Sequence, residues 1–300
     1  MKTPRAAVAL LALVLPACAV KKLAVNSLGN ALAESGGTYA SDDDPDLIAD
    51  ATPFALKTIE SLLAASPRHR GLLLAAARGF TQYGYAFVEQ EADFAEEQDL
   101  ARATHLRDRA RRLYLRALDY GLRGLEVDLP ELRTRLRQDP EAALARATRK
   151  QLPLLYWTAN AWGAAISISK SDSELTADQR SAEALMRRAL ALDEAYEWGS
   201  IHDFFITYEG GRSSVGGSIA EARKHLDRAL ALSKGCRAAP FVAFAETVDV
   251  TQQDGEEFDK LLHQALDVDP DKVPELRLSN LIYQRRARWL LTRRADLFVE

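Results

Sequence analysis

The stretch FDKLLHQALDVDP, from Phe258 to Pro270, decides the fold class of this chain. Its apolar pattern has spacings of four, three, one and two residues, at Phe258, Leu262, Ala265, Leu266 and Val268. On an α-helix this spacing places all five side chains on one face. A proline disfavours the α region for the residue before it, so the segment predicts an amphipathic helix that ends at Pro270.

The same order of residue types recurs along the chain. Close copies occupy residues 110–120, 182–192 and 222–232, and a looser copy occupies residues 55–65. Generic amphipathic helices share most of the pattern, but they rarely repeat an Ala-Leu pair in the same register. This chain does so four times, beginning at Ala117, Ala189, Ala229 and Ala265. The repetition is typical of the second helix of a tetratricopeptide repeat, which is about 34 residues long.

The copies are unevenly spaced. The first marked residues Ala182, Ala222 and Phe258 follow one another at 40 and 36 residues, whereas the earlier copies are farther apart. We therefore expect an all-α fold, with tetratricopeptide-like helical repeats in a single compact, irregular superhelical bundle.

The composition agrees with a helical fold and gives few hints of a partner. The 300 residues are rich in Ala, Leu, Arg and Glu, and no alternating β-branched run with hairpin turn residues is present, so strands are not expected. A net charge of −4 gives no reason to expect nucleic-acid binding. Since no Pro-, Gly- or Ser-rich linker divides the chain, residues 18–300 are expected to form a single domain.

Residues 1–17 have the pattern of a bacterial lipoprotein signal peptide. Lys2 and Arg5 precede an apolar segment that is too short to be a preferred membrane span. The following LPAC, which ends at Cys18, resembles a lipobox, whose cysteine is lipidated. The alternative is an ordinary secretory signal with an accidental cysteine. Lipidation would anchor an otherwise soluble protein, and Ala19 lacks the aspartate of inner-membrane lipoproteins, which favours the outer membrane.

Several helix ends and breaks are also predicted. Asp44 is expected to cap a helix that Pro53 kinks or divides. A long polar-faced helix is expected over residues 95–120, with Gly121 as its stop. Two short helices are expected to be split at Asp139-Pro140.

The sequence contains no convincing catalytic or metal-binding motif. It has no His-Glu-x-x-His, no paired Cys/His zinc spacing and no Gly-x-Ser-x-Gly elbow. The acidic run Asp42-Asp43-Asp44 lacks the spacing of an EF-hand and is better explained by helix capping. The Gly-rich residues 209–217 lack the Lys-Ser/Thr ending of a phosphate loop. We therefore expect neither enzymatic activity nor a cofactor nor a metal.

An aromatic set with one polar member is the strongest candidate for a ligand pocket. Its members fall in the first helices of successive repeats, which tend to line the concave side of a helical array. Hydroxyl and indole groups among apolar surfaces suit a ligand cavity, although ordinary core packing is the alternative. The candidates are Tyr83, Tyr85, Phe87, Tyr156, Trp157, Asn160, Trp162, Trp198, Phe205 and Tyr208.

Short blocks in a fixed order resemble a known family. The first are DDDPDL at 42–47, PFALK at 53–57, IESL at 59–62 and YAFV at 85–88. Later blocks are Tyr156-Trp157, Ala161-Trp162, Gly216-Gly217, Leu278-Ser279-Asn280 and Arg286-Ala287. Together they are similar to the T-component (TatT) family of TRAP transporters (tripartite ATP-independent periplasmic transporters). The resemblance extends over roughly residues 18–298.

The resemblance implies more than the repeats do. It implies a lipid-anchored protein on the periplasmic side of the bacterial envelope, assembled as a homotrimer. It also implies binding to a periplasmic substrate-binding protein of a TRAP transporter, and an apolar channel for a hydrophobic ligand. Two alternatives remain, a general envelope scaffold for protein–protein interaction and a carrier of apolar molecules.

Overall fold

The computed structural model describes residue 29 and residues 36–212 and 216–299. Within these ranges the chain consists of helices and their connections, without a strand, so the predicted all-α fold is confirmed. No helix of the same ranges is long and apolar enough to cross a membrane. The signal peptide and Cys18 lie outside the described residues.

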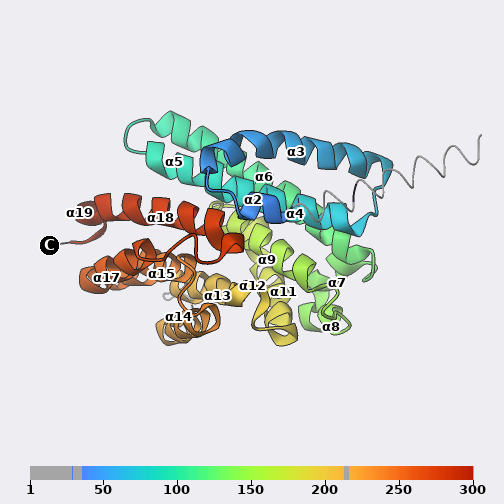
Figure 1. The fold of residues 1–300 in the computed structure, drawn as a ribbon. Helices are drawn as coiled ribbons and strands as arrows, with labels where there is room; N and C mark the ends of the chain where they lie inside the picture. The colour runs from blue at the N-terminus through green and yellow to red at the C-terminus, as the bar shows by residue number, and fades with distance from the viewer. Residues whose placement is uncertain (1–28, 30–35, 213–215, 300) are drawn as a thin grey trace, which may run out of the picture.

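The first part of the chain forms long helices that lie against one another (Figure 1). The side chain of Asp44 accepts hydrogen bonds from the N–H groups of Asp46 and Leu47, so Asp44 caps the helix that begins at Pro45, as predicted. The elements are α2 (Gly36–Ala40), α3 (Pro45–Ala65), α4 (Arg70–Gly84), the π-helix η1 (Tyr85–Glu89), α5 (Gln90–Ala95) and α6 (Leu100–Glu126).

Shorter helices follow α6 and lead to a central apolar helix. The predicted break at Asp139-Pro140 is confirmed, since Asp139 ends one short helix and caps the next by accepting from the N–H of Ala142. The elements are α7 (Leu132–Gln138), α8 (Pro140–Leu144), α9 (Leu152–Ser167), α10 (Ser173–Ala177) and α11 (Gln179–Leu192). Helix α9 packs against α4, α6 and α11.

The last part of the chain packs against the first part. Helix α18 packs against α15 and α17 on one side and against α2 and α3 on the other, so it closes the bundle (Figure 1). The elements are α12 (Tyr196–Gly199), α13 (Ile201–Gly210), α14 (Ile219–Ser233), α15 (Ala239–Phe244), the π-helix η3 (Ala245–Asp249), α16 (Val250–Gln252), α17 (Gly255–Leu266), the 3-10 helix η4 (Pro274–Leu276), α18 (Arg277–Thr292) and α19 (Arg294–Leu297).

The repeated pattern supplies the core. In the copies that begin at Ala110, Ala182, Ala222 and Phe258, the first three marked side chains are at most 2% exposed. Their helices α6, α11, α14 and α17 pack against the earlier helices α4, α9, α13 and α15, respectively. Alanine occupies the third marked position of all four copies and the first of three, and its small side chain lets a neighbouring helix approach closely. The stacking of these pairs as tetratricopeptide-like repeats stays a prediction.

Gly121 does not stop a helix, and Pro53 does not divide one. Pro53 lies within the single helix α3, so the division is excluded and the kink stays a prediction. Helix α6 begins after Asp99 and passes through Gly121 to end at Glu126. Gly121 is required for contact rather than for termination, because a Cβ there would lie 2.3 Å from Oγ1 and 3.3 Å from the Cα of Thr158 on α9.

We predict that Gly121→Ala destabilises the protein. The added methyl group must push α6 and α9 apart, and overpacking of this kind costs about 1–3 kcal/mol, which outweighs the roughly 0.5–1 kcal/mol that alanine contributes as a better helix former. The free energy of unfolding in urea measures the effect. Gly37→Ala is the matched control, since a Cβ at Gly37 meets no atom within 4 Å. Equal stabilities of the two variants would contradict the prediction.

Candidate functional site

Arg286 on α18 joins acidic side chains from two distant parts of the chain. Its side chain is only 8% exposed, and Nη1 lies 2.8 Å from Oδ2 of Asp93 on α5. Nη2 donates to Glu246 in η3. The guanidinium carbon also lies 4.3 Å from the ring centroid of Trp289, within cation–π range. One buried arginine therefore connects α5, η3 and α18.

Two π-helical turns place acidic groups around Arg286. The first, η1, lies between α4 and α5 and ends at Glu89, four residues before Asp93. The second, η3, lies between α15 and α16 and contains Glu246. A π-turn accommodates an extra residue and changes the direction of the side chains that follow, and such turns are frequent at functional sites.

Glu89 is an acidic group whose pKa is raised into the neutral range. Burial raises the pKa of Glu89 to about 7, although a hydrogen bond from Tyr114 opposes the shift. The hydroxyl of Tyr114 donates to Oε2 of Glu89, and the Tyr114 side chain is fully buried. Glu89 can therefore gain or lose a proton inside the protein under physiological conditions.

These groups line a cavity of about 460 Å³. Its apolar wall comes from α18 and the neighbouring elements, and its polar part contains three carboxyl groups, one arginine and one lysine. The lining residues are Glu89, Asp93, Ser167, Ile168, Lys170, Glu246, Val250, Arg286, Trp289, Leu290 and Leu297. The cavity can accept a guest with both apolar and polar parts, within the size range of small-molecule sites.

A second buried ion pair joins Asp203 on α13 to Arg237, which precedes α15 in the chain. Nη1 of Arg237 lies 3.1 Å from Oδ1 of Asp203. Burial raises the pKa of Asp203, and the positive charge of Arg237 opposes this. Burial and the charge of Asp203 raise the pKa of Tyr156 to about 12. Tyr156 therefore stays neutral in this polar interior.

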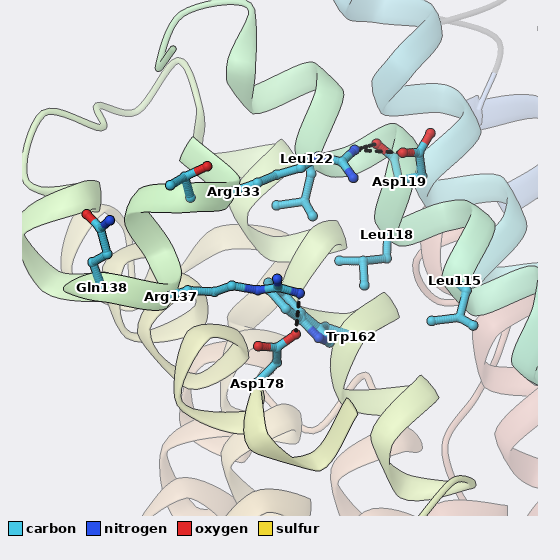
Figure 2. Close-up of a pocket in the computed structure, with 10 residues that line it drawn as sticks. Leu115, Leu118, Asp119, Leu122, Arg133, Arg137, Gln138, Trp162 and Asp178 are labelled. Carbon is cyan, nitrogen blue, oxygen red and sulfur yellow. Dashed lines mark hydrogen bonds and ion pairs between the residues drawn. The ribbon is translucent and has the colours of Figure 1, made fainter. Parts of the chain in front are cut away.

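A separate cavity of about 550 Å³ lies among α6, α7, α9 and the start of α11 (Figure 2). Leu115, Leu118 and Leu122 of α6 form an apolar wall, and charged side chains from α7 form part of the rim. Trp162 of α9 belongs to the lining as well. This cavity is the more apolar of the two.

The predicted ligand-pocket residues are dispersed. Trp162 lines the 550 Å³ cavity, and the other nine, all within the described residues, line neither cavity. Six of them form pairs in aromatic contact, namely Tyr83 with Phe87, Tyr156 with Trp157, and Phe205 with Tyr208. Tyr85 packs against Tyr283. The side chain of Asn160 donates to the carbonyl of Tyr156. A ligand role for this set stays a prediction.

Among the predicted ligand-pocket residues, Trp198 lies at the surface, where it is 36% exposed. It sits in a left-handed turn in which φ is +47° at Glu197, +53° at Trp198 and +78° at Gly199. A non-glycine residue in this region costs about 1–2 kcal/mol, and strained backbone is common at binding sites. The turn gives Trp198 a fixed, unusual presentation on the surface.

The sequence gives no local signal for the charged interior. Glu89, Glu246 and Asp203 follow no catalytic motif, and Arg286 occurs only within a two-residue family-like block. A π-turn has no sequence signature comparable to a capping motif. The available hint is a charged residue at a helix position whose neighbours on the same face are apolar.

The fold and these cavities define an all-α protein of packed helix pairs. Among the described residues, no group of three or more His, Cys, Asp or Glu side chains is arranged to hold a metal ion. A family model described as "TRAP transporter T-component" matches residues 41–298. The chain belongs to this family, which confirms the resemblance inferred from the short blocks and assigns the protein a role in association with a TRAP transporter at the cell envelope.

The chain is also similar to a protein of Treponema pallidum (strain Nichols) that is described as "Uncharacterized protein". The two are 30% identical over 305 residues, and the match covers 94% of each chain. The similarity therefore extends over most of the chain.

We predict that Glu89→Gln weakens the pH dependence of stability. Between the ordinary pKa of 4.5 and the folded value of about 7, the folded protein binds more protons at Glu89 than the unfolded chain does. The free energy of unfolding therefore falls as pH rises through this range. Because glutamine does not titrate, the decrease from pH 5 to pH 8 should be smaller by about 2–3 kcal/mol in the variant.

Urea unfolding at several pH values provides the measurement. Asp249 contributes in the same direction, because burial raises its pKa to about 8, so some pH dependence should persist in Glu89→Gln. Glu141→Gln is the control, since the Glu141 side chain is 69% exposed on α8. A Glu89→Gln profile that parallels the wild type would refute the assignment.

Proposed function

We propose that this protein is a lipid-anchored, periplasmic accessory protein that binds a TRAP-type substrate-binding protein and assists solute import without catalysing a reaction. The observation that carries the proposal is the family match over residues 41–298. The lipobox-like sequence before Cys18 supports a lipid anchor. Ala19 favours attachment to the outer membrane.

A binding role also fits the chemistry of the interior. The cavities combine apolar walls with charged groups, and a paired-helix framework offers large surfaces for other proteins. Trp198, exposed on a strained turn, has the properties of an interface anchor, because tryptophan is enriched among the residues that dominate binding energy. We assign the substrate-binding protein as the partner of this surface.

Recovery of the partner from membranes tests the proposal. The tagged protein should recover the TRAP substrate-binding protein from the native cell envelope. Trp198→Ala should reduce the recovered amount at least tenfold, because residues that dominate an interface contribute about 2 kcal/mol or more. Cys18→Ser should leave the membrane fraction and lose incorporated fatty acid. Intact, tethered protein that recovers no substrate-binding protein would overturn the proposal.

We further propose that the protein assembles as a homotrimer through the outer face of α3. Leu47 and Phe54 are 56% and 79% exposed. They are seven residues apart, so they lie on the same side of the helix. Two large apolar side chains on one exposed helix face favour contact with a second copy.

Phe54→Ser should therefore shift the molecular mass in solution from trimer towards monomer. Light scattering coupled to gel filtration measures the mass at fixed protein concentration. Leu100→Ser is the matched control, because Leu100 is 64% exposed but lies at the start of α6. A wild-type monomer, or an equal effect of both substitutions, would contradict the proposed interface.

The carrier role is the second candidate function. It is favoured by the 550 Å³ cavity, whose wall contains three leucines and a tryptophan. In this role the protein would hold a hydrophobic ligand during transfer to or from the substrate-binding protein.

A further inference from the structure

We propose that the 550 Å³ cavity is a binding site for an amphiphilic carboxylate, with its chain on the α6 leucines and its headgroup at Arg137. The inference deepens the carrier role proposed above and rests on it for its biological setting. Its evidence is the cavity itself, which has an apolar wall and a rim on which two arginines lie beside two aspartates (Figure 2). A buried donor in its lining has no hydrogen-bond partner in the part of the chain that the structure describes.

The apolar wall arises from helix geometry. Leu115, Leu118 and Leu122 are spaced by three and four residues, so they lie on one face of α6. All three side chains line the cavity, and Figure 2 shows them along α6. A cavity of 550 Å³ is within the range of 300–1,000 Å³ typical of small-molecule sites. The wall suits an alkyl or aryl chain.

The rim is formed by one face of α7. Arg133 and Arg137 are four residues apart and both line the cavity. Arg133 Nη2 lies 2.6 Å from Oδ1 of Asp119, whereas Arg137 Nη2 lies 3.6 Å from Oδ2 of Asp178. The Arg137 side chain is 72% exposed. At 3.6 Å the contact with Asp178 is beyond hydrogen-bond distance, so the donors of Arg137 stay available to another carboxylate.

The hydrogen-bond donors of the lining favour an anionic guest over a cationic one. Trp162 is 4% exposed, and its Nε1 has no hydrogen-bond partner among the described residues. An indole N–H only donates, and an unpaired buried donor is unfavourable. Thr134 and Gln138 add further donors at the rim. A carboxylate at the rim can accept a hydrogen bond from Arg137, Thr134 or Gln138, whereas an ammonium accepts from none of them.

The two acidic residues at the cavity do not reverse this preference. Asp119 is held by Arg133 and also lies 3.5 Å from Arg123. Asp178 is only 19% exposed and lies between α10 and α11, where its carbonyl accepts from the N–H groups of Ser181 and Ala182. Its short side chain is therefore less free to reach a guest than the long side chain of Arg137.

Calorimetry with headgroup-matched probes tests the inference. The full chain carrying Cys18→Ser keeps every described residue and avoids the acyl anchor. Decanoate should bind at least tenfold more tightly than decanol and decyltrimethylammonium, all below their aggregation concentrations, because a hydrogen bond to a charged group changes affinity by roughly this factor. Arg137→Gln should weaken decanoate binding about tenfold and leave decanol unchanged. Trp162→Phe should weaken decanoate several-fold while keeping the aromatic wall.

Arg180→Gln is the matched control. It removes the same charge from a side chain that is 73% exposed on α11 and lies outside the cavity lining. Decanoate binding should be unchanged in this variant. Circular dichroism confirms folding, and Arg133→Gln provides a second rim variant if Arg137→Gln unfolds.

Equal affinity for the three probes, or equal decanoate affinity in folded Arg137→Gln and Arg180→Gln, would overturn the inference. Recovery of the substrate-binding protein is measured separately and does not require the carboxylate. Retained decanoate selectivity without recovery of that partner would overturn only the proposed binding of the substrate-binding protein. Recovery of the substrate-binding protein without decanoate selectivity would overturn only the ligand assignment.

Discussion

The closed form of this bundle depends on the contact between the last long helix and the first ones. Arg286 on α18 reaches Asp93 on α5 and Glu246 in η3, so one guanidinium fixes three elements that are far apart in sequence. Arg285, its neighbour, donates to the carbonyl of Ala86 in η1. A repeat array held only by neighbour contacts would have free ends, whereas these bonds connect the two ends of the described fold.

A buried charged contact of this kind holds helices together at a cost in free energy. Burial of an ion pair costs several kcal/mol per ion, and apolar residues of similar volume often give equal or higher stability. Removing one partner is strongly unfavourable, because the other charge stays buried. The Arg286 network therefore specifies one arrangement of α5, η3 and α18 more than it adds stability. The same burial raises the pKa of Glu89 to about 7, so the geometry of this region is linked to proton binding.

The part of the fold that the sequence predicts is the part fixed by local spacing. The positions marked by Ala182, Met186 and Ala189 are buried because a period of 3.6 residues directs them to one face. Glycine at position 121 predicts a helix stop, yet it marks a contact with Thr158, and this contact depends on a residue 37 positions later. Likewise, Trp162 could be selected as a pocket residue from its chemistry, but its place in the same cavity as the α7 arginines is a tertiary property.

The irregular repeat spacing explains where the larger cavity lies. The pattern copies that begin at Ala110 and Ala182 belong to α6 and α11, and the intervening chain contains α7 and α8 as well as α9. Helix α7 has only seven residues, so it contributes a rim of four side chains beside α6 instead of a full-length packed face. A regular helix pair would fill this space with apolar side chains. The departure from the repeat therefore creates the cavity, and the arginines of the short helix determine which headgroup it accepts.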